Sequence, residues 1–126
     1  MNKNVQDWVE QYQADLKTAR DNITLKNYYA SVNFSQQAAE KALKSLFIQQ
    51  FAKLPPKIHD LTELCRQVKA PPHVIEEASK LTITFFSSRY PGTQGKIPAK
   101  YYTQSKAQLH LKESEVIITW CKEQIQ

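Results

Sequence analysis

The residues of this chain with the clearest potential for chemistry lie in the segment SSRYPG at positions 87–92. Arg89 falls four residues after Phe85 and eight after Leu81, so a helix continued through it places the guanidinium along an apolar face. An arginine on an inward face needs a partner, because an unpaired buried charge is costly. Two alternatives stay open: Arg89 binds helix C-terminal carbonyls or a buried carboxylate such as Glu40, or it contacts a ligand or nucleic acid.

Polar residues elsewhere in the chain are candidates for the same site. Asn33 interrupts a long helix-forming stretch, and we expect it to hydrogen-bond across to another helix. His59 precedes Asp60 at the start of a short helix, so the pair either caps that helix or contributes a histidine to the site. Lys41 and Lys44 form either a solvated helix face or a source of positive potential beside a ligand.

Metal and classical hydrolase chemistry are not indicated by the spacing of the ligand-type residues. The two cysteines and three histidines are scattered, at Cys65, Cys121, His59, His73 and His110. This pattern lacks zinc-ligand spacing, so we expect no metal site and no cofactor. Each cysteine falls within an apolar helical stripe, which favours buried free thiols over a disulfide. No Ser/His/Asp triad or carboxylate pair is evident, which argues mildly against a metabolic enzyme.

Length and charge indicate one modestly basic domain. A chain of 126 residues forms a single domain, 1–126, and its net charge of +5 permits contact with nucleotides or nucleic acid without demonstrating it. The N-terminus has no apolar signal region, and no apolar run is long enough to span a bilayer. We therefore expect a cytoplasmic protein with no membrane contact.

Helical periodicity predicts an all-α protein, and only two glycines are available for tight turns. The predicted helices cover about residues 4–20, 28–52, 60–69 and 72–88. A final helix, capped by Thr103 or Ser105, is expected to reach almost to Gln126. Asp21 and Asn22 are expected to break the first helix, with Thr24 a candidate N-cap for the second. The stretch Tyr28–Phe51 organises the rest, because its small residues allow close approach of another helix. We expect an up-and-down four-helix bundle with one additional short helix.

Four segments occur in a recognisable order along almost the whole chain. They read NFSQQAAEKALKSLF, KIHDLTEL, SSRYPG and YYTQSKAQLHLKESEVIITWCKEQI. Together they resemble the HEPN domain, particularly the small stand-alone bacterial and archaeal members. The resemblance implies a helical bundle that forms homodimers and is often paired with a small nucleotidyltransferase, in toxin–antitoxin or other modules. It also implies nucleotide binding or metal-independent RNase activity.

HEPN RNases carry an arginine followed, after four to six residues, by a histidine that faces the same cleft. In such a site a histidine moves the proton of a 2′-hydroxyl while the arginine stabilises the phosphorane charge. Arg89 resembles that arginine, but residues 90–95 contain no histidine, so the RNase motif is degenerate. Arg66 and His73 satisfy the spacing, but Pro71 and Pro72 intervene and the pair lies one helix too early.

The leading hypothesis is a dimeric HEPN-type binding or regulatory protein, acting on a nucleotide, RNA or a partner nucleotidyltransferase. Arg89 would supply the phosphate or partner contact, with Tyr90, Asn33 and His59 nearby and Lys41 or Lys44 adding positive potential. One rival is an endoribonuclease toxin that uses Arg89 with a non-standard histidine, His59. The other is a purely structural dimer whose inward polar residues fix the packing of the bundle.

Overall fold

The computed structural model describes residues 2–92 and 95–125, and over these residues the secondary structure is helical throughout, without strands. In chain order the segments are α1 Lys3–Thr24, α2 Tyr28–Phe51, α3 Leu61–Gln67, α4 Pro72–Thr82, α5 Thr84–Ser87, α6 Pro98–Tyr101 and α7 Gln104–Gln124. The predicted all-α bundle is confirmed. None of the helices in this described part is long and apolar enough to cross a membrane.

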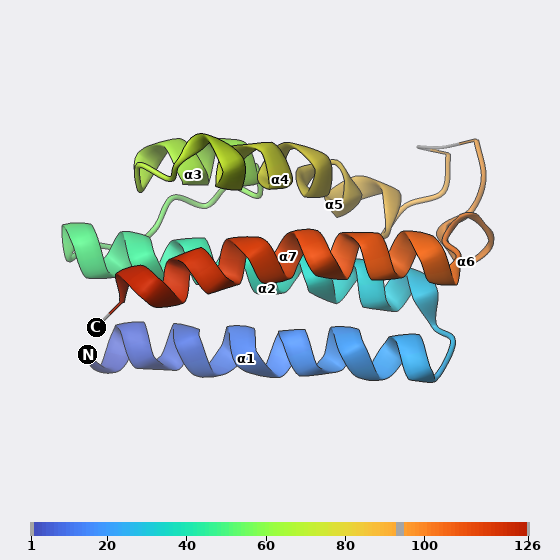
Figure 1. Cartoon of the computed structure of the whole chain (residues 1–126), viewed down its shortest axis with the longest axis horizontal. Helices are drawn as coiled ribbons and strands as arrows, with labels where there is room; N and C mark the ends of the chain where they lie inside the picture. The colour runs from blue at the N-terminus through green and yellow to red at the C-terminus, as the bar shows by residue number, and fades with distance from the viewer. Residues whose placement is uncertain (1, 93–94, 126) are drawn as a thin grey trace.

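The helices form three layers (Figure 1). α1 packs along α2, α2 packs against α7, and α4 lies on α7 with α3 beside it. α1 and α2 run antiparallel because a short turn joins them, in which Lys26 adopts a positive φ of 64°. α6 lies at the end of the bundle where α2 and α7 begin, and both chain termini lie at the opposite end.

The core follows the apolar face of α2, as its sequence predicts. Its small residues are fully buried and let the neighbouring helices approach: Ala38, Ala39 and Ala42. Leu43 and Leu46 then add bulk toward the C-terminal half of the helix, with Leu46 only 1% exposed. Burial of such leucines contributes on the order of 2 kcal/mol each.

Two predicted helix boundaries are wrong at the α1–α2 junction. α1 continues through Asp21 and Asn22 to Thr24. Asp21 forms an ion pair with Lys17, one turn earlier, at 2.6 Å. Asn22 Nδ2 donates a hydrogen bond to the Thr18 carbonyl at 2.9 Å. Both contacts favour helix over the predicted break. The position before α2 is therefore Asn27, not Thr24, and its side chain makes no capping hydrogen bond.

The predicted fourth helix is divided at Ile83 into α4 and α5. At this point the Thr84 hydroxyl donates to the Leu81 carbonyl, at 2.7 Å. Side chains that bond to the preceding turn compete with the regular helical hydrogen bonds and bend helices. The break leaves Phe85 in the short helix α5, and Arg89 follows the C-terminal end of that helix.

Cys65 and Cys121 are free and buried, as predicted. Burial raises the pKa of the Cys65 thiol to about 12 and also raises the pKa of Cys121. A raised pKa suppresses the thiolate, which is the reactive form. We expect both thiols of the native protein to react with Ellman's reagent roughly 1,000-fold more slowly than in guanidinium. Rapid labelling of either thiol without denaturant would contradict this burial.

Candidate functional site

Arg89 is held at the C-terminal end of α5 by two contacts with the same residue. Its Nη1 donates to the Phe85 carbonyl at 2.9 Å, and its Cζ lies 4.0 Å from the centroid of the Phe85 ring. Cations favour both helix C-terminal carbonyls and aromatic faces. Burial lowers the pKa of Arg89, while the charge of Glu40 acts in the opposite direction. The helix-terminal contact proposed from the sequence is therefore present.

Glu40 is the centre of a hydrogen-bonded cluster on the middle of α2. Its side chain is 12% exposed and accepts from Lys44 Nζ at 3.0 Å and from Gln36 Nε2 at 3.0 Å. His59 Nδ1 lies 3.1 Å from both carboxylate oxygens. Burial alone would raise the pKa of Glu40, but hydrogen bonds from Gln36, Lys44 and His59, with the charge of Lys44, hold that pKa below its ordinary value. Glu40 is thus ionised at neutral pH.

An ionised Glu40 fixes the hydrogen-bonding role of His59. Because a carboxylate only accepts, His59 Nδ1 must donate to it, which leaves Nε2 as the outward-acting nitrogen. Within residues 2–92 and 95–125, no side chain or backbone group hydrogen-bonds Nε2. The His59 side chain is 54% exposed, so a ligand can reach it.

Phe85 connects His59 to Arg89. The His59 ring stacks on Phe85 with centroids 4.0 Å apart and planes inclined by 15°. The same ring carries the Arg89 guanidinium. Because both groups lie 4.0 Å from the ring, they occupy opposite faces of Phe85, which stands between a histidine from the α2–α3 connection and an arginine that follows α5.

The start of α3 fixes the backbone that carries His59. Asp60 is the N-cap, accepting from the Thr62 and Glu63 backbone amides at 3.0 and 3.4 Å, as the sequence predicts. The hydrogen bond from the Thr62 side chain contributes most to a lowered pKa of Asp60. Leu61 donates its backbone N–H to the Thr82 hydroxyl at 2.9 Å, which ties the start of α3 to the end of α4.

The remaining candidate residues lie elsewhere. Lys41 forms an ion pair with Asp15 of α1, whose side chain is only 5% exposed. Asn33 bonds to Gln37 one turn along α2, so the predicted contact with another helix is replaced by one within its own helix. Tyr90 is 52% exposed and lies near Phe86, with centroids 6.2 Å apart.

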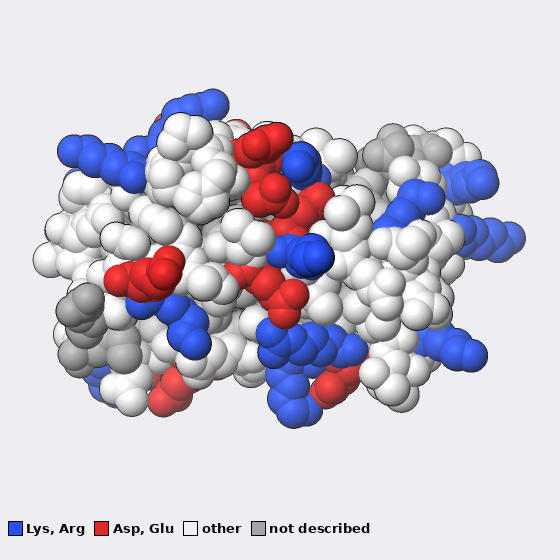
Figure 2. All heavy atoms as spheres, viewed as in Figure 1, with Lys and Arg blue, Asp and Glu red and all other residues white. Residues whose placement is uncertain are grey.

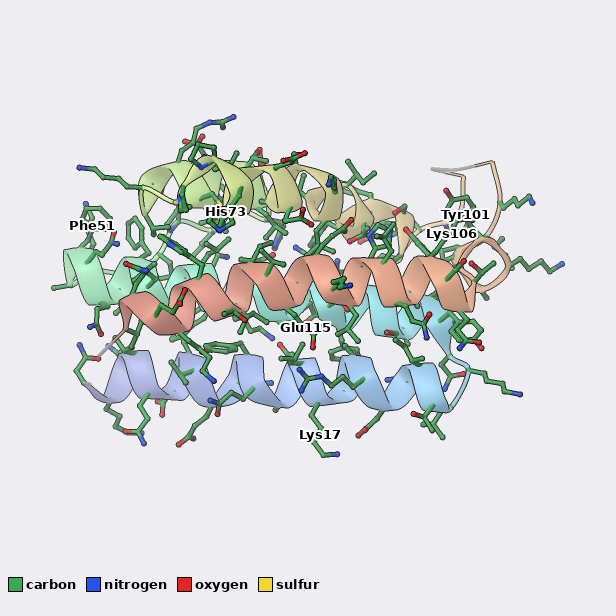
Figure 3. The ribbon with its side chains drawn as sticks, in the orientation of Figure 1. Lys17, Phe51, His73, Tyr101, Lys106 and Glu115 are labelled. Atoms are coloured by element: carbon green, nitrogen blue, oxygen red, sulfur yellow. The ribbon has the colours of Figure 1, made fainter. Side chains whose placement is uncertain are left out.

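Arg66 and His73, which match the RNase spacing literally, have separate surroundings. Arg66 pairs with Glu63 one turn earlier, at 3.2 Å. His73 is a residue of α4 (Figure 3). Together with Lys112 and Trp120 of α7 it lines a hollow. Neither residue contacts the cluster around Glu40.

Two residues of the cluster were missed by sequence reasoning. Phe85 was assigned to the apolar stripe of a single long helix, although its place four residues before Arg89 is the spacing of a cation–aromatic pair. Gln36 carried no distinguishing signal, because a glutamine four residues before Glu40 is common on exposed helix faces. His59 and Lys44 contact Glu40 directly, and His59 and Arg89 both contact the Phe85 ring.

The fold and cluster define an all-α helical bundle with an arginine and a carboxylate-bound histidine on one aromatic ring. The chain belongs to the HEPN domain family, whose sequence model matches residues 5–124. A search of curated proteins finds no match.

Solved structures agree with this assignment. The structure of TT1696 from Thermus thermophilus is similar with a TM-score of 0.88 and 27% identity, covering 99% of this chain and 100% of that one. ST0689, described as an archaeal HEPN homologue, is similar with a TM-score of 0.80 and 30% identity, and both chains are covered completely. A HEPN domain protein from Thermotoga maritima shares the fold with a TM-score of 0.72 at 19% identity, covering 93% of this chain and 95% of that one.

Proposed function

We propose that this HEPN protein binds the phosphate groups of nucleotides or RNA at Arg89 and His59, as a binding or regulatory module. The observation that carries the proposal is the Phe85 ring, whose two faces position the His59 ring, at 4.0 Å between centroids, and Arg89 Cζ, at 4.0 Å from the centroid. Arginine has five N–H donors in a planar fork that matches phosphate oxygens. Only one of them is hydrogen-bonded in the described part of the chain, to Phe85. The others are available to a phosphate.

The charges around the site also favour an anion. Lys44 offsets the negative charge of Glu40 at a distance of 3.0 Å. Arg89 then supplies the positive charge that an anion would contact. Because Arg89 is half-buried, its attraction for a phosphate is screened less than that of a surface lysine.

The proposal is tested by titrating the protein with ATP, GTP and a short RNA, followed by melting temperature and fluorescence anisotropy. Wild type is compared with Arg89→Ala, and Arg66→Ala is the matched control because that arginine is exposed and pairs only with Glu63. We expect binding that Arg89→Ala weakens and Arg66→Ala leaves unchanged. Absence of binding, or equal loss in both variants, would refute the proposed site.

A second candidate function, metal-independent RNA cleavage, is favoured by the Glu40–His59 hydrogen bond. A carboxylate that accepts from Nδ1 orients the imidazole so that Nε2 can take the proton of a 2′-hydroxyl, and Arg89 can stabilise the phosphorane. The chain departs from the arginine–histidine spacing of HEPN RNases, so this histidine would come from another segment. Cleavage of RNA should then be lost in His59→Ala and retained in His73→Ala. Cleavage that is absent, or that survives His59→Ala, excludes it.

We also propose that the protein forms a homodimer. α5 and the residues that flank it expose a row of large apolar side chains near Arg89 in the sequence: Ile83, Phe86 and Tyr90, each more than half exposed. Such a row is costly to leave in water and suits a second copy of this chain.

Phe86→Glu should convert the dimer to a monomer, because it places a charge in the apolar row. Sedimentation velocity measures the change, with Leu54→Glu as the control, since Leu54 is 80% exposed and lies outside the row. An identical sedimentation coefficient for wild type and Phe86→Glu would contradict this interface.

We further propose that the protein is cytoplasmic and pairs with a small nucleotidyltransferase in a two-component, toxin–antitoxin-like module. Family membership supports this pairing. Co-expression with a nucleotidyltransferase encoded by a neighbouring gene should yield a complex that co-purifies through size exclusion. If no such gene adjoins, or if the two proteins separate, the pairing is refuted while the phosphate site is unaffected.

A further inference from the structure

The end of the bundle where α6 lies is free of acidic residues. Residues 22–39 contain no Asp or Glu, and neither do residues 78–112. These two stretches meet in space, because the α1–α2 turn, α6 and the start of α7 lie at the same end (Figure 1). Figure 2 shows Lys and Arg but no Asp or Glu over this end of the visible face. This end of the bundle therefore carries positive side chains without acidic ones beside them, although exposed lysines such as Lys53 and Lys57 also lie elsewhere.

The lysines of this end have no acidic partners. Lys26, Lys96 and Lys100 are exposed, and none forms an ion pair with any residue in the described ranges. Over the middle of the bundle the cations are mostly neutralised, as in the Arg20–Glu115 pair at 2.7 Å. A group of unpaired lysines raises a local positive potential that attracts polyanions.

Aromatic and apolar side chains are interleaved with these lysines. Lys106 lies over the Tyr101 ring, with Nζ 4.8 Å from the centroid, and Figure 3 shows both at the α6 end. Tyr29 is 43% exposed and Ile97 is 44% exposed. Positive charge alternating with exposed rings is typical of surfaces that bind single-stranded nucleic acid, where the backbone contacts the cations and the bases stack.

A buried contact connects this end to the Arg89 site. The hydroxyls of Ser87, at the end of α5, and Tyr102, which follows α6, are hydrogen-bonded to each other. Both residues are 4% exposed, so the contact is part of the interior. Arg89 and Lys100 each lie two residues from it in the sequence. The segment that carries Arg89 is therefore joined to the segment that carries Lys100 through one interior contact.

We infer that the lysine surface formed by Lys26, Lys96, Lys100 and Lys106 is a second contact surface for the backbone of a single-stranded nucleic acid bound at Arg89. This inference rests on the phosphate-binding role proposed above and makes the ligand a polynucleotide rather than a mononucleotide. Each phosphate contact releases counterions, so the affinity for a strand should depend steeply on salt.

The experiment measures binding of a fluorescent oligouridylate of about 12 nucleotides, a length within the range that single-strand surfaces cover. Lys26→Ala/Lys96→Ala/Lys100→Ala is compared with Lys53→Ala/Lys57→Ala/Lys122→Ala, which removes the same charge from exposed lysines at other positions. We expect the first variant to lose about 100-fold in affinity at about 0.1 M salt. The slope of log affinity against log salt concentration should also become shallower, by the equivalent of about two phosphate contacts. The control should stay within about threefold of wild type.

ATP and Arg89→Ala separate the two proposals. We expect the triple variant at the α6 end to keep its affinity for ATP and lose only the strand, whereas Arg89→Ala weakens both. Equal effects of the two triple variants would overturn the lysine surface and leave the Arg89 site standing. If Arg89→Ala changes the affinity for neither ATP nor the oligouridylate, the proposed function is overturned. Lysine-dependent binding to phosphatidylserine vesicles, without binding to the strand, would show that the surface contacts a membrane and overturn the inference.

Discussion

Arg89→Ala is expected to weaken the binding of a short RNA by about 10- to 100-fold, because a charge-assisted hydrogen bond contributes roughly 1.5–3 kcal/mol. The guanidinium is already positioned by the Phe85 ring and carbonyl, so little side-chain entropy is lost when a phosphate binds. Fluorescence anisotropy at fixed salt measures the loss. An affinity within twofold of wild type would contradict the assignment.

Arg89→Lys distinguishes the geometry of the site from its charge. A lysine keeps the positive charge but lacks the planar fork that can bond a carbonyl and a phosphate together. We expect it to recover less than half of the lost binding free energy. Full recovery would show that only charge matters, and the contact with Phe85 would then have no part in binding. Thermal melting of both variants checks that the fold is retained.

Glu40→Leu should lower the free energy of unfolding by about 3 kcal/mol, since removing one partner of a buried ion pair leaves the other charge uncompensated. Lys44 is the partner, with a side chain only 8% exposed. His59 and Gln36 lose their acceptor at the same time. Denaturant unfolding measures the change.

Two comparison variants make the measurement specific. Replacing both partners, as Glu40→Leu/Lys44→Leu, should restore most of the lost stability because no unpaired charge remains. Glu115→Leu breaks the more exposed pair with Arg20 and should cost less than about 1 kcal/mol. A loss in Glu40→Leu no larger than in Glu115→Leu would contradict the structural role of Glu40.

The effect of Glu40→Leu should also depend on pH in a known direction. The pKa of Glu40 is lowered in the folded protein, so its stabilisation is present above the ordinary carboxyl pKa of 4.5 and is lost as the pH falls through the folded value. The difference between wild type and Glu40→Leu is therefore large at neutral pH and shrinks toward the acid limit. Asp60 also has a lowered pKa, so acid destabilisation of wild type is not due to Glu40 alone.

Much of the fold could be predicted because the long helices have strong periodic patterns. The stretch Tyr28–Phe51 forms the single long helix α2, although its N-cap position is Asn27, and Asp60 and Thr103 cap α3 and α7 with their side chains. The errors fall where a local side-chain contact decides the backbone. Asn22 bonds back to Thr18 and extends α1, and Thr84 bonds back to Leu81 at the break after α4. α6 has only four residues, too few for a periodic pattern.

Less of the site could be predicted, because it depends on which face of a helix each residue occupies. Lys41 and Lys44 are three residues apart, yet the first contacts Asp15 of α1 and the second contacts Glu40. Their spacing can be read from the sequence, but the acidic side chains with which the two lysines pair cannot. The suggestion that Arg89 lies near Glu40 came from charge balance alone. The contact between Phe85 and His59 joins residues 26 apart in the sequence, so it cannot be read from helical spacing.

The most direct test of the phosphate site is nuclear magnetic resonance of the histidine rings during titration with ATP. The chain has three histidines, so each ring signal can be assigned by substitution. His59 shares the Phe85 ring with Arg89, whereas His73 lies between α4 and α7 and His110 is bonded to the buried Glu113. We expect ATP to shift the His59 signal, to leave His73 and His110 in place, and to have no effect in Arg89→Ala. A stationary His59 signal, or equal shifts of all three, would contradict a phosphate site at Arg89 and His59.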